Sequence, residues 1–140
     1  NLAANCIFCR IIGKEIPAEI IHEDNKTITF LDIAPIHPGH ALTVSKEHHE
    51  TFLKTPEETA CHMLSVVKKI ADAILKATSA QGINIGINNG NAAGQAVMHT
   101  HYHIIPRFTN DGLKHWPQQA YKPNQMKTIA ERIKQELSDH

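Results

Sequence analysis

Three histidines stand at alternate positions in this sequence, at His99, His101 and His103. Side chains alternate between the two faces of a β-strand, so on a strand these imidazoles would project from one face. Imidazole is the side chain most often used for metal binding and for proton transfer near neutral pH. The spacing therefore favours a reactive imidazole cluster, or a metal site with its ligands on one strand, over a chance cluster on a solvated face.

The segment before the histidines is rich in glycine and alanine and predicts a turn over residues 89–94. Asn88 and Gln95 flank this turn. Such residues often do no more than stabilise a turn. Their position next to the histidines makes the loop a candidate ligand cradle.

Two of the three cysteines, Cys6 and Cys9, have C-x-x-C spacing, and Cys61 stands apart. A C-x-x-C pair is half of a four-ligand zinc site. Reduced thiols without a metal are the alternative, and redox chemistry is less favoured because no βαβ pattern of the thioredoxin type surrounds the pair. Three cysteines without a disulfide framework are typical of a reducing compartment, so we expect a cytoplasmic protein.

Residues 95–107 resemble the signature of the histidine-triad (HIT) superfamily, which is His-x-His-x-His followed by two apolar residues. Residues 7–17, 30–33 and 38–48 are similar to the N-terminal half of that family in order and spacing. That half is more similar to the Hint branch, whereas residues 104–107 are more similar to the dinucleoside-hydrolysing Fhit branch.

The resemblance implies a nucleotide hydrolase or transferase with His101 as its nucleophile. His101 would attack the α-phosphorus of a dinucleoside polyphosphate or a nucleoside phosphoramidate, form a nucleotidyl-histidine and release nucleoside monophosphate after hydrolysis. A neutral imidazole with an ordinary pKa of ~6.5 is available for this attack at pH 7. The resemblance adds His99 and His103 to the catalytic set and places His40 beside the triad. It assigns contacts with the phosphate or leaving group to Asn88 and Gln95. Backbone amides around Gly94 and a protonated His103 could add further donors.

The same resemblance implies a purine pocket, a structural zinc site and a homodimer of single HIT domains, each spanning residues 1–140. The pocket residues would be Ile7, Phe8, Ile11, Phe30, Asp32 and Ile33. The Asp32 carboxylate would accept hydrogen bonds from the ribose hydroxyls. Without the resemblance, the apolar members are typical of a core and Asp32 of a strand-end cap. The zinc ligands would be Cys6, Cys9, His48 and His99, a closed tetrahedral set.

Ala96 departs from the family pattern, in which Ser or Thr often follows the glutamine and hydrogen-bonds the leaving group. Without that hydroxyl, a basic amine leaves with less help. This departure favours the alternative of a purine-nucleotide-binding regulatory or scaffold protein with vestigial hydrolysis. A catalytic zinc hydrolase that uses the triad as its ligands is a further, less favoured alternative.

The elements that must position these residues follow from hydrophobic periodicity and turn residues. Alternating and β-branched stretches predict strands, and apolar residues at 3–4 spacing predict helices. The predicted strands are residues 19–23, 27–32, 40–45, 82–88 and 98–106, and the predicted helices are residues 6–12, a long helix opened by Pro56, and residues 124–137. This order favours the α+β class and a HIT-like fold: an antiparallel sheet of about five strands, with the long helix and the C-terminal helix packed on it.

Length, charge and hydropathy bound the function. The 140 residues suffice for one domain. Fourteen Lys and Arg balance 14 Asp and Glu, which excludes the basic surface of a nucleic-acid binder. No apolar run approaches the ~20 residues that cross a bilayer. We therefore expect a purine nucleotide and a second copy of the chain as partners, rather than nucleic acid or a membrane.

Overall fold

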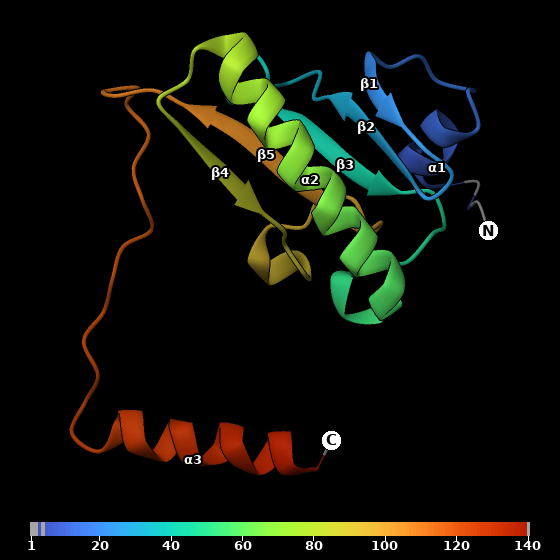
Figure 1. Ribbon diagram of the computed structural model, residues 1–140. Coiled ribbons are helices and arrows are strands. Elements are labelled where there is room, and N and C mark those ends of the chain that lie inside the picture. The colour runs from blue at the N-terminus through green and yellow to red at the C-terminus, as the bar shows by residue number, and fades with distance from the viewer. Residues whose placement is uncertain (1–2, 4, 140) are drawn as a thin grey trace.

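A five-stranded antiparallel sheet in the order β1-β2-β3-β5-β4 forms the centre of the protein. The computed structural model describes residue 3 and residues 5–139 (Figure 1). The strands are β1 (Ile20–Glu23), β2 (Thr27–Leu31), β3 (Ala41–Ser45), β4 (Gly82–Gly86) and β5 (His101–Arg107). The helices are α1 (Ile7–Ile12), α2 (Glu57–Thr78) and α3 (Gln125–Ser138), with short 3-10 helices η1 (Phe52–Lys54) and η2 (Asn91–Ala93). The predicted α+β class and five-stranded sheet are confirmed.

Helix α2 covers one face of the sheet (Figure 1). Its apolar residues recur every three or four positions, so they share one side of the helix. The buried residues on that side are Met63, Val66, Val67, Ile70, Ala71 and Ile74, and they pack against Ala41, Tyr102 and Ile104 of the sheet. Burying each large aliphatic side chain contributes about 1.5–3 kcal/mol, so this cluster is a main source of stability.

The opposite face of the sheet packs against α1. Phe8 and Ile11 of this short helix join Phe30, Leu42 and Val44 of the strands in a second buried cluster. Because side chains alternate along β5, Tyr102 and Ile104 face α2 while His101 and His103 face the α1 side. The sheet therefore places the reactive imidazoles on the face opposite its long helix.

Strand β5 begins at His101, three residues later than predicted. The amide of His99 bonds the carbonyl of Val97, and the amide of Thr100 bonds the carbonyl of His49. These bonds bend residues 97–100 toward the segment after β3. The prediction that all three histidines alternate on one strand is therefore right for His101 and His103 and wrong for His99.

Helix α3 forms close to its predicted position, but its predicted packing on the sheet is wrong. An extended segment leads it away from the sheet (Figure 1), and none of its residues is buried. Both faces of the sheet already have covers, α2 on one side and α1 on the other. The 3–4 spacing of α3 identified an apolar side but carried no information about what that side contacts. Within the described residues, no helix is long and apolar enough to cross a membrane.

Candidate active site and metal centre

The tautomer of His101 is fixed by the main chain. Its Nδ1 lies 2.6 Å from the carbonyl oxygen of His99, and a carbonyl can only accept. The proton of the neutral ring is therefore on Nδ1, and Nε2 carries a free lone pair. A buried imidazole held in this way has the form that a nucleophile needs.

His40 and His103 form a second fixed pair beside it. The amide N–H of Ile36 donates to Nδ1 of His40 at 3.1 Å, so the proton of neutral His40 must be on Nε2. That Nε2 lies 3.0 Å from Nδ1 of His103 and donates to it. His103 then carries its own proton on Nε2. The rings of His101 and His103 have centroids 5.0 Å apart, so a lone pair and an N–H donor lie on neighbouring rings.

Burial keeps all three imidazoles neutral. Desolvation is the largest cause that lowers the pKa of His40, His101 and His103 below the ordinary value. The Asp32 carboxylate, 3.8 Å from Nε2 of His40, opposes this effect without reversing it. The described tautomers therefore persist at neutral pH.

The turn before the histidines is held together by Gln95. Its Oε1 accepts the Gly90 amide at 2.8 Å, and its Nε2 donates to the carbonyls of Glu50 and Val97 at 2.6 and 2.9 Å. With both amide hydrogens used, Gln95 shapes the loop and has no donor left for phosphate in this structure.

The other predicted phosphate contacts in this loop, Asn88 and Gly94, differ in the hydrogen bonds that they already make. The Asn88 amide makes a long 3.5 Å contact to the Gly94 carbonyl, and Gly94 has a positive φ of 91°. Glycine adopts this conformation without the cost that a Cβ brings. The Asn88 amide is thus available as a donor, whereas the amides of Gly94 and Gln95 already donate to the carbonyls of Asn91 and Gly90 at 3.0 and 3.1 Å.

The predicted nucleoside residues divide into a buried and an accessible group. Phe8, Ile11 and Phe30 are buried, as the core interpretation expects. The Phe8 ring packs edge-on against His101, with centroids 5.0 Å apart.

The accessible group lies at the surface. The exposed fraction is 46% for Ile7 and 93% for Ile33. Asp32 accepts the amide of Ala34 at 2.9 Å, as a turn residue would, and its other oxygen faces His40. The structure thus brings Asp32 to the imidazole cluster and leaves Ile33 without packing; the base-binding role of both groups stays a prediction.

Four ligand atoms converge beside this cluster. The closest pairs are Cys6 Sγ to His99 Nδ1 at 3.3 Å, Cys9 Sγ to His48 Nδ1 at 3.3 Å, and the two imidazole Nδ1 atoms at 3.1 Å. All four atoms lie within 4.8 Å of one another. Tetrahedral zinc with these donors requires edges of roughly 3.3–3.8 Å.

The chemistry of the donors also suits zinc. Nε2 of His99 donates to the Ser45 carbonyl at 2.6 Å, which leaves the Nδ1 lone pair free. Burial lowers the pKa of His99 to about 4, so the ring is neutral. Burial also raises the pKa of the Cys9 thiol, so a thiolate there needs a cation beside it. Cys6, Cys9, His48 and His99 would hold a closed, structural zinc ion.

A catalytic metal held by the three histidines does not fit this geometry. His99 commits both ring nitrogens elsewhere. Asp32, His40 and His103 do approach one another, but Nε2 of His40 carries the proton that the Ile36 amide dictates. A protonated nitrogen cannot ligate a metal. The two clusters therefore have different chemistry, one suited to zinc and one to phosphate.

Sequence reasoning missed the residues that hold His40. Ile36 acts through its backbone amide, which no residue type reveals. His37 stands three residues before His40, and the sequence indicates no partner for it; the structure pairs it with Asp111, 3.2 Å away and 74 positions along the chain. The one indication in the sequence was an arginine and an aspartate four positions apart, Arg107 and Asp111, which form a bidentate ion pair in the structure.

Comparison with known proteins identifies one family of relatives. A family model described as "HIT domain" matches residues 13–110. The chain is 36% identical to the adenosine 5'-monophosphoramidase hnt1 of Schizosaccharomyces pombe, covering 95% of this chain and 98% of that protein. It is 40% identical to the adenylylsulfatase HINT3 of Arabidopsis thaliana, covering 91% of this chain and 64% of that protein.

Solved structures show the same arrangement of elements. A crystal structure of a HIT family member from Bacillus subtilis has a TM-score of 0.86 at 38% identity, covering 94% of this chain and 96% of that one. A zinc-bound histidine-triad family protein from Mycobacterium smegmatis has a TM-score of 0.75 at 34% identity, covering 97% of this chain and 98% of that one.

Proposed function

The chain belongs to the HIT family, and from that premise we propose that it is a nucleotide hydrolase or transferase that cleaves at the α-phosphorus through a nucleotidyl-histidine. The observation that carries this proposal is the pair of fixed tautomers, with a free lone pair on His101 Nε2 and an N–H on His103 Nε2. A binding module has no need of a nucleophile held in its reactive form. Substrates are nucleoside phosphoramidates and related mixed anhydrides, or dinucleoside polyphosphates.

The first step is attack by the lone pair of His101 Nε2 on the α-phosphorus. The bond from phosphorus to the leaving group breaks, and a basic leaving group takes up a proton from solvent, because Ala96 offers no hydroxyl. The His103 Nε2–H and the side-chain amide of Asn88 stabilise the charge on the non-bridging oxygens. The His99 carbonyl stabilises the ring of His101 as it becomes positive.

In the second step, water attacks the same phosphorus and gives up one proton to solvent, and the phosphorus–nitrogen bond to His101 breaks. Nucleoside monophosphate leaves and the neutral imidazole is regenerated. Splitting the displacement into two steps lowers each barrier. Asp32 would orient the ribose through its hydroxyls.

The names of two relatives support the phosphoramidate and mixed-anhydride class as the first to test. One is named an adenosine 5'-monophosphoramidase and the other an adenylylsulfatase. Both names describe an adenylyl group that is transferred from nitrogen or sulfate oxygen to water.

Zinc and a second copy of the chain complete the proposal. A zinc ion on the Cys6 and Cys9 side would tie the N-terminal segment to His99, two residues before the nucleophile. A homodimer would use α2 and β4, which is an edge strand of the sheet.

The test measures, by chromatography, the release of adenosine monophosphate from adenosine 5'-phosphoramidate and from diadenosine tetraphosphate. Wild-type protein should release it and His101→Ala should not. His62→Ala is the matched control, because His62 lies on α2 and bonds Asp24, away from the cluster. If wild type binds nucleotide but cleaves neither substrate, the hydrolase proposal is wrong for these substrates and a nucleotide-binding regulatory role replaces it.

A further inference from the structure

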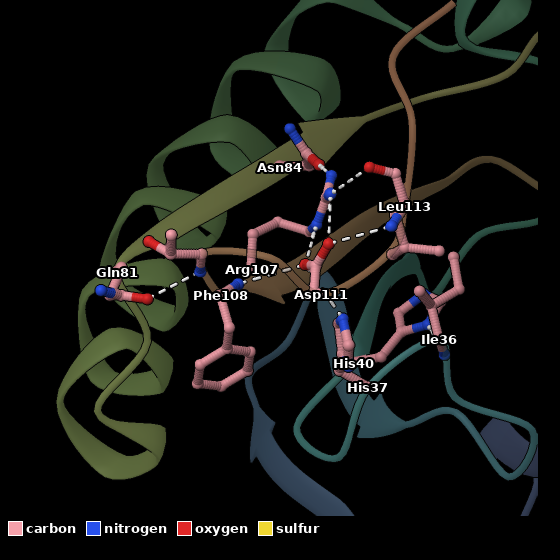
Figure 2. Close-up of polar contacts among 10 residues, drawn as sticks. Ile36, His37, His40, Gln81, Asn84, Arg107, Phe108, Asp111 and Leu113 are labelled. Atoms are coloured by element: carbon pink, nitrogen blue, oxygen red, sulfur yellow. Dashed lines mark hydrogen bonds and ion pairs between the residues drawn. The ribbon is translucent and has the colours of Figure 1, made fainter.

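Asp111 lies at the centre of a hydrogen-bond node at the end of β5 (Figure 2). Arg107 holds its carboxylate with two bonds, from Nε to Oδ2 at 2.7 Å and from Nη2 to Oδ1 at 3.0 Å. The amides of Phe108 and Leu113 donate to it at 3.2 and 3.1 Å. Its side chain is only 6% exposed, so the carboxylate itself has little contact with water. The node fixes Asp111 firmly to the strand that carries His103.

One further bond from this node crosses to another part of the chain. His37 donates from Nε2 to Oδ2 of Asp111 at 3.2 Å, and its ring packs edge-on against Phe108 with centroids 5.5 Å apart. Figure 2 shows His37, Ile36 and His40 together on the loop that faces this node. Asp111 therefore joins the strand of His103 to the loop of His40.

The loop from residue 36 to residue 40 is constrained at its other end as well. The amide of His40 bonds the carbonyl of His37 at 3.0 Å. Gly39 has a φ of 101°, and a Cβ there would lie 2.8 Å from Cγ2 of Thr78 on α2. The loop is thus pressed against α2 on one side and bonded to Asp111 on the other, which leaves its amides little freedom.

We propose that Asp111 and His37 are positioning residues that hold this loop so that the Ile36 amide fixes the tautomers of His40 and His103. The amide donates to His40 Nδ1, His40 Nε2 donates to His103 Nδ1, and His103 is left with its proton on Nε2. Neither Asp111 nor His37 is within hydrogen-bond distance of the cluster imidazoles, so both act through the loop. The proposal rests on the proposed function for its kinetic consequence but not for its effect on the tautomers.

Two conservative variants test the link. His37→Phe keeps an aromatic ring against Phe108 and removes the bond to Asp111. Asp111→Asn keeps the shape and the acceptor oxygen of the carboxamide and removes the charge that holds Arg107. Asp24→Asn is the matched control, because Asp24 also accepts two backbone amides and a histidine, at the β1–β2 turn on the α2 side.

The primary measurement is long-range nitrogen–proton NMR of the histidine rings in the full chain, with circular dichroism to confirm folding. Wild type and Asp24→Asn should show His40 and His103 protonated only on Nε2. Both test variants should show the two tautomers in exchange at these two histidines. Unchanged ring nitrogens in folded His37→Phe would overturn the proposal.

Single-turnover kinetics with adenosine 5'-phosphoramidate give the second measurement. Loosened positioning should lower kcat by about tenfold in both test variants, with KM within about twofold of wild type. Equal losses in Asp24→Asn would show that only stability matters and would also overturn the proposal. If wild type cleaves no substrate, the proposed function fails while the NMR result still decides whether Asp111 and His37 set the tautomers.

Discussion

The carbonyl oxygen of His99 accepts the Nδ1 proton of His101 at 2.6 Å, while the ring of His99 presents its own Nδ1 to the cysteine sulfurs. His99 thus belongs to both clusters: its side chain is one of the four candidate metal ligands, and its carbonyl oxygen accepts a hydrogen bond from His101. Any shift of the His99 backbone changes the hydrogen bond that sets the tautomer of His101. The two clusters are therefore mechanically coupled through this residue.

Removal of zinc should lower both stability and activity. A metal bound only by the native state raises stability by about 3 kcal/mol when its concentration is a hundred times Kd. Cys9→Ser and prolonged chelation should both lower Tm and slow release of nucleoside monophosphate. Metal content by mass spectrometry, thermal unfolding and single-turnover rates check this expectation.

Cys61→Ser is the control for that experiment, because Cys61 is exposed and lies outside the metal cluster. It should retain the metal, the Tm and the rate of wild type. A purified protein that holds no zinc yet unfolds at the same temperature after zinc is added would contradict the prediction.

The pH profile should show an acid limb below the ordinary histidine range. Burial lowers the pKa of His40 and His103, so both stay neutral as the pH falls through 6.5. Protonation of either ring below its lowered pKa destroys the relay from His40 Nε2 to His103 Nδ1. We expect kcat/KM to stay constant as the pH is lowered to 6.5. Below the lowered pKa it should decrease about tenfold per pH unit. A limb centred above pH 6.5 would contradict this assignment.

Sequence reasoning predicted the sheet and the residue types of both clusters, because these follow from periodicity and from a specific motif. It could not predict the bend at residues 97–100, which depends on bonds to the segment after β3. The resemblance assigned Gln95 to phosphate, but in the structure the carbonyls of Glu50 and Val97 accept both hydrogens of its amide.

The same limit applies to long-range partners. Asp111 and His37 are 74 positions apart, and only the folded sheet brings them together. For helix α3, the 3–4 periodicity predicted the helix correctly, but the predicted packing on the sheet was wrong. A local sequence pattern indicates whether a segment forms a helix or a strand. The surface against which that element packs depends on which surfaces the rest of the chain leaves uncovered.

Charges on α2 and β4 should convert the proposed homodimer to a monomer. Leu64 on α2 and Ile85 on β4 are large apolar side chains with 48% and 45% exposed surface. A stable interface of ordinary size buries about 1,600 Å² and does not tolerate unpaired charges at its centre. Leu64→Glu combined with Ile85→Glu should therefore halve the mass measured by light scattering. Leu53→Glu on η1 is the control and should leave the mass unchanged; a wild-type monomer would contradict the proposal.

A hydroxyl restored after Gln95 should accelerate cleavage of basic leaving groups. Ala96 lines a cavity of about 410 Å³ together with Ile7 and Met98, so a serine at this position has room for its oxygen. A hydroxyl there can hydrogen-bond an amine as it departs, whereas a polyphosphate departs with little need of a proton. Ala96→Ser should raise kcat for adenosine 5'-phosphoramidate by about threefold to tenfold and leave cleavage of diadenosine tetraphosphate within about twofold.

Ala92→Ser, an exposed position on η2 in the same loop, separates this effect from a general change of the loop. It should change neither rate. Equal acceleration of both substrates by Ala96→Ser would mean that the hydroxyl reorganises the loop held by Gln95 and does not act on the leaving group. No change with either substrate would mean that the cavity beside Ala96 does not receive the leaving group, and the departure from the family pattern would then have no bearing on substrate preference.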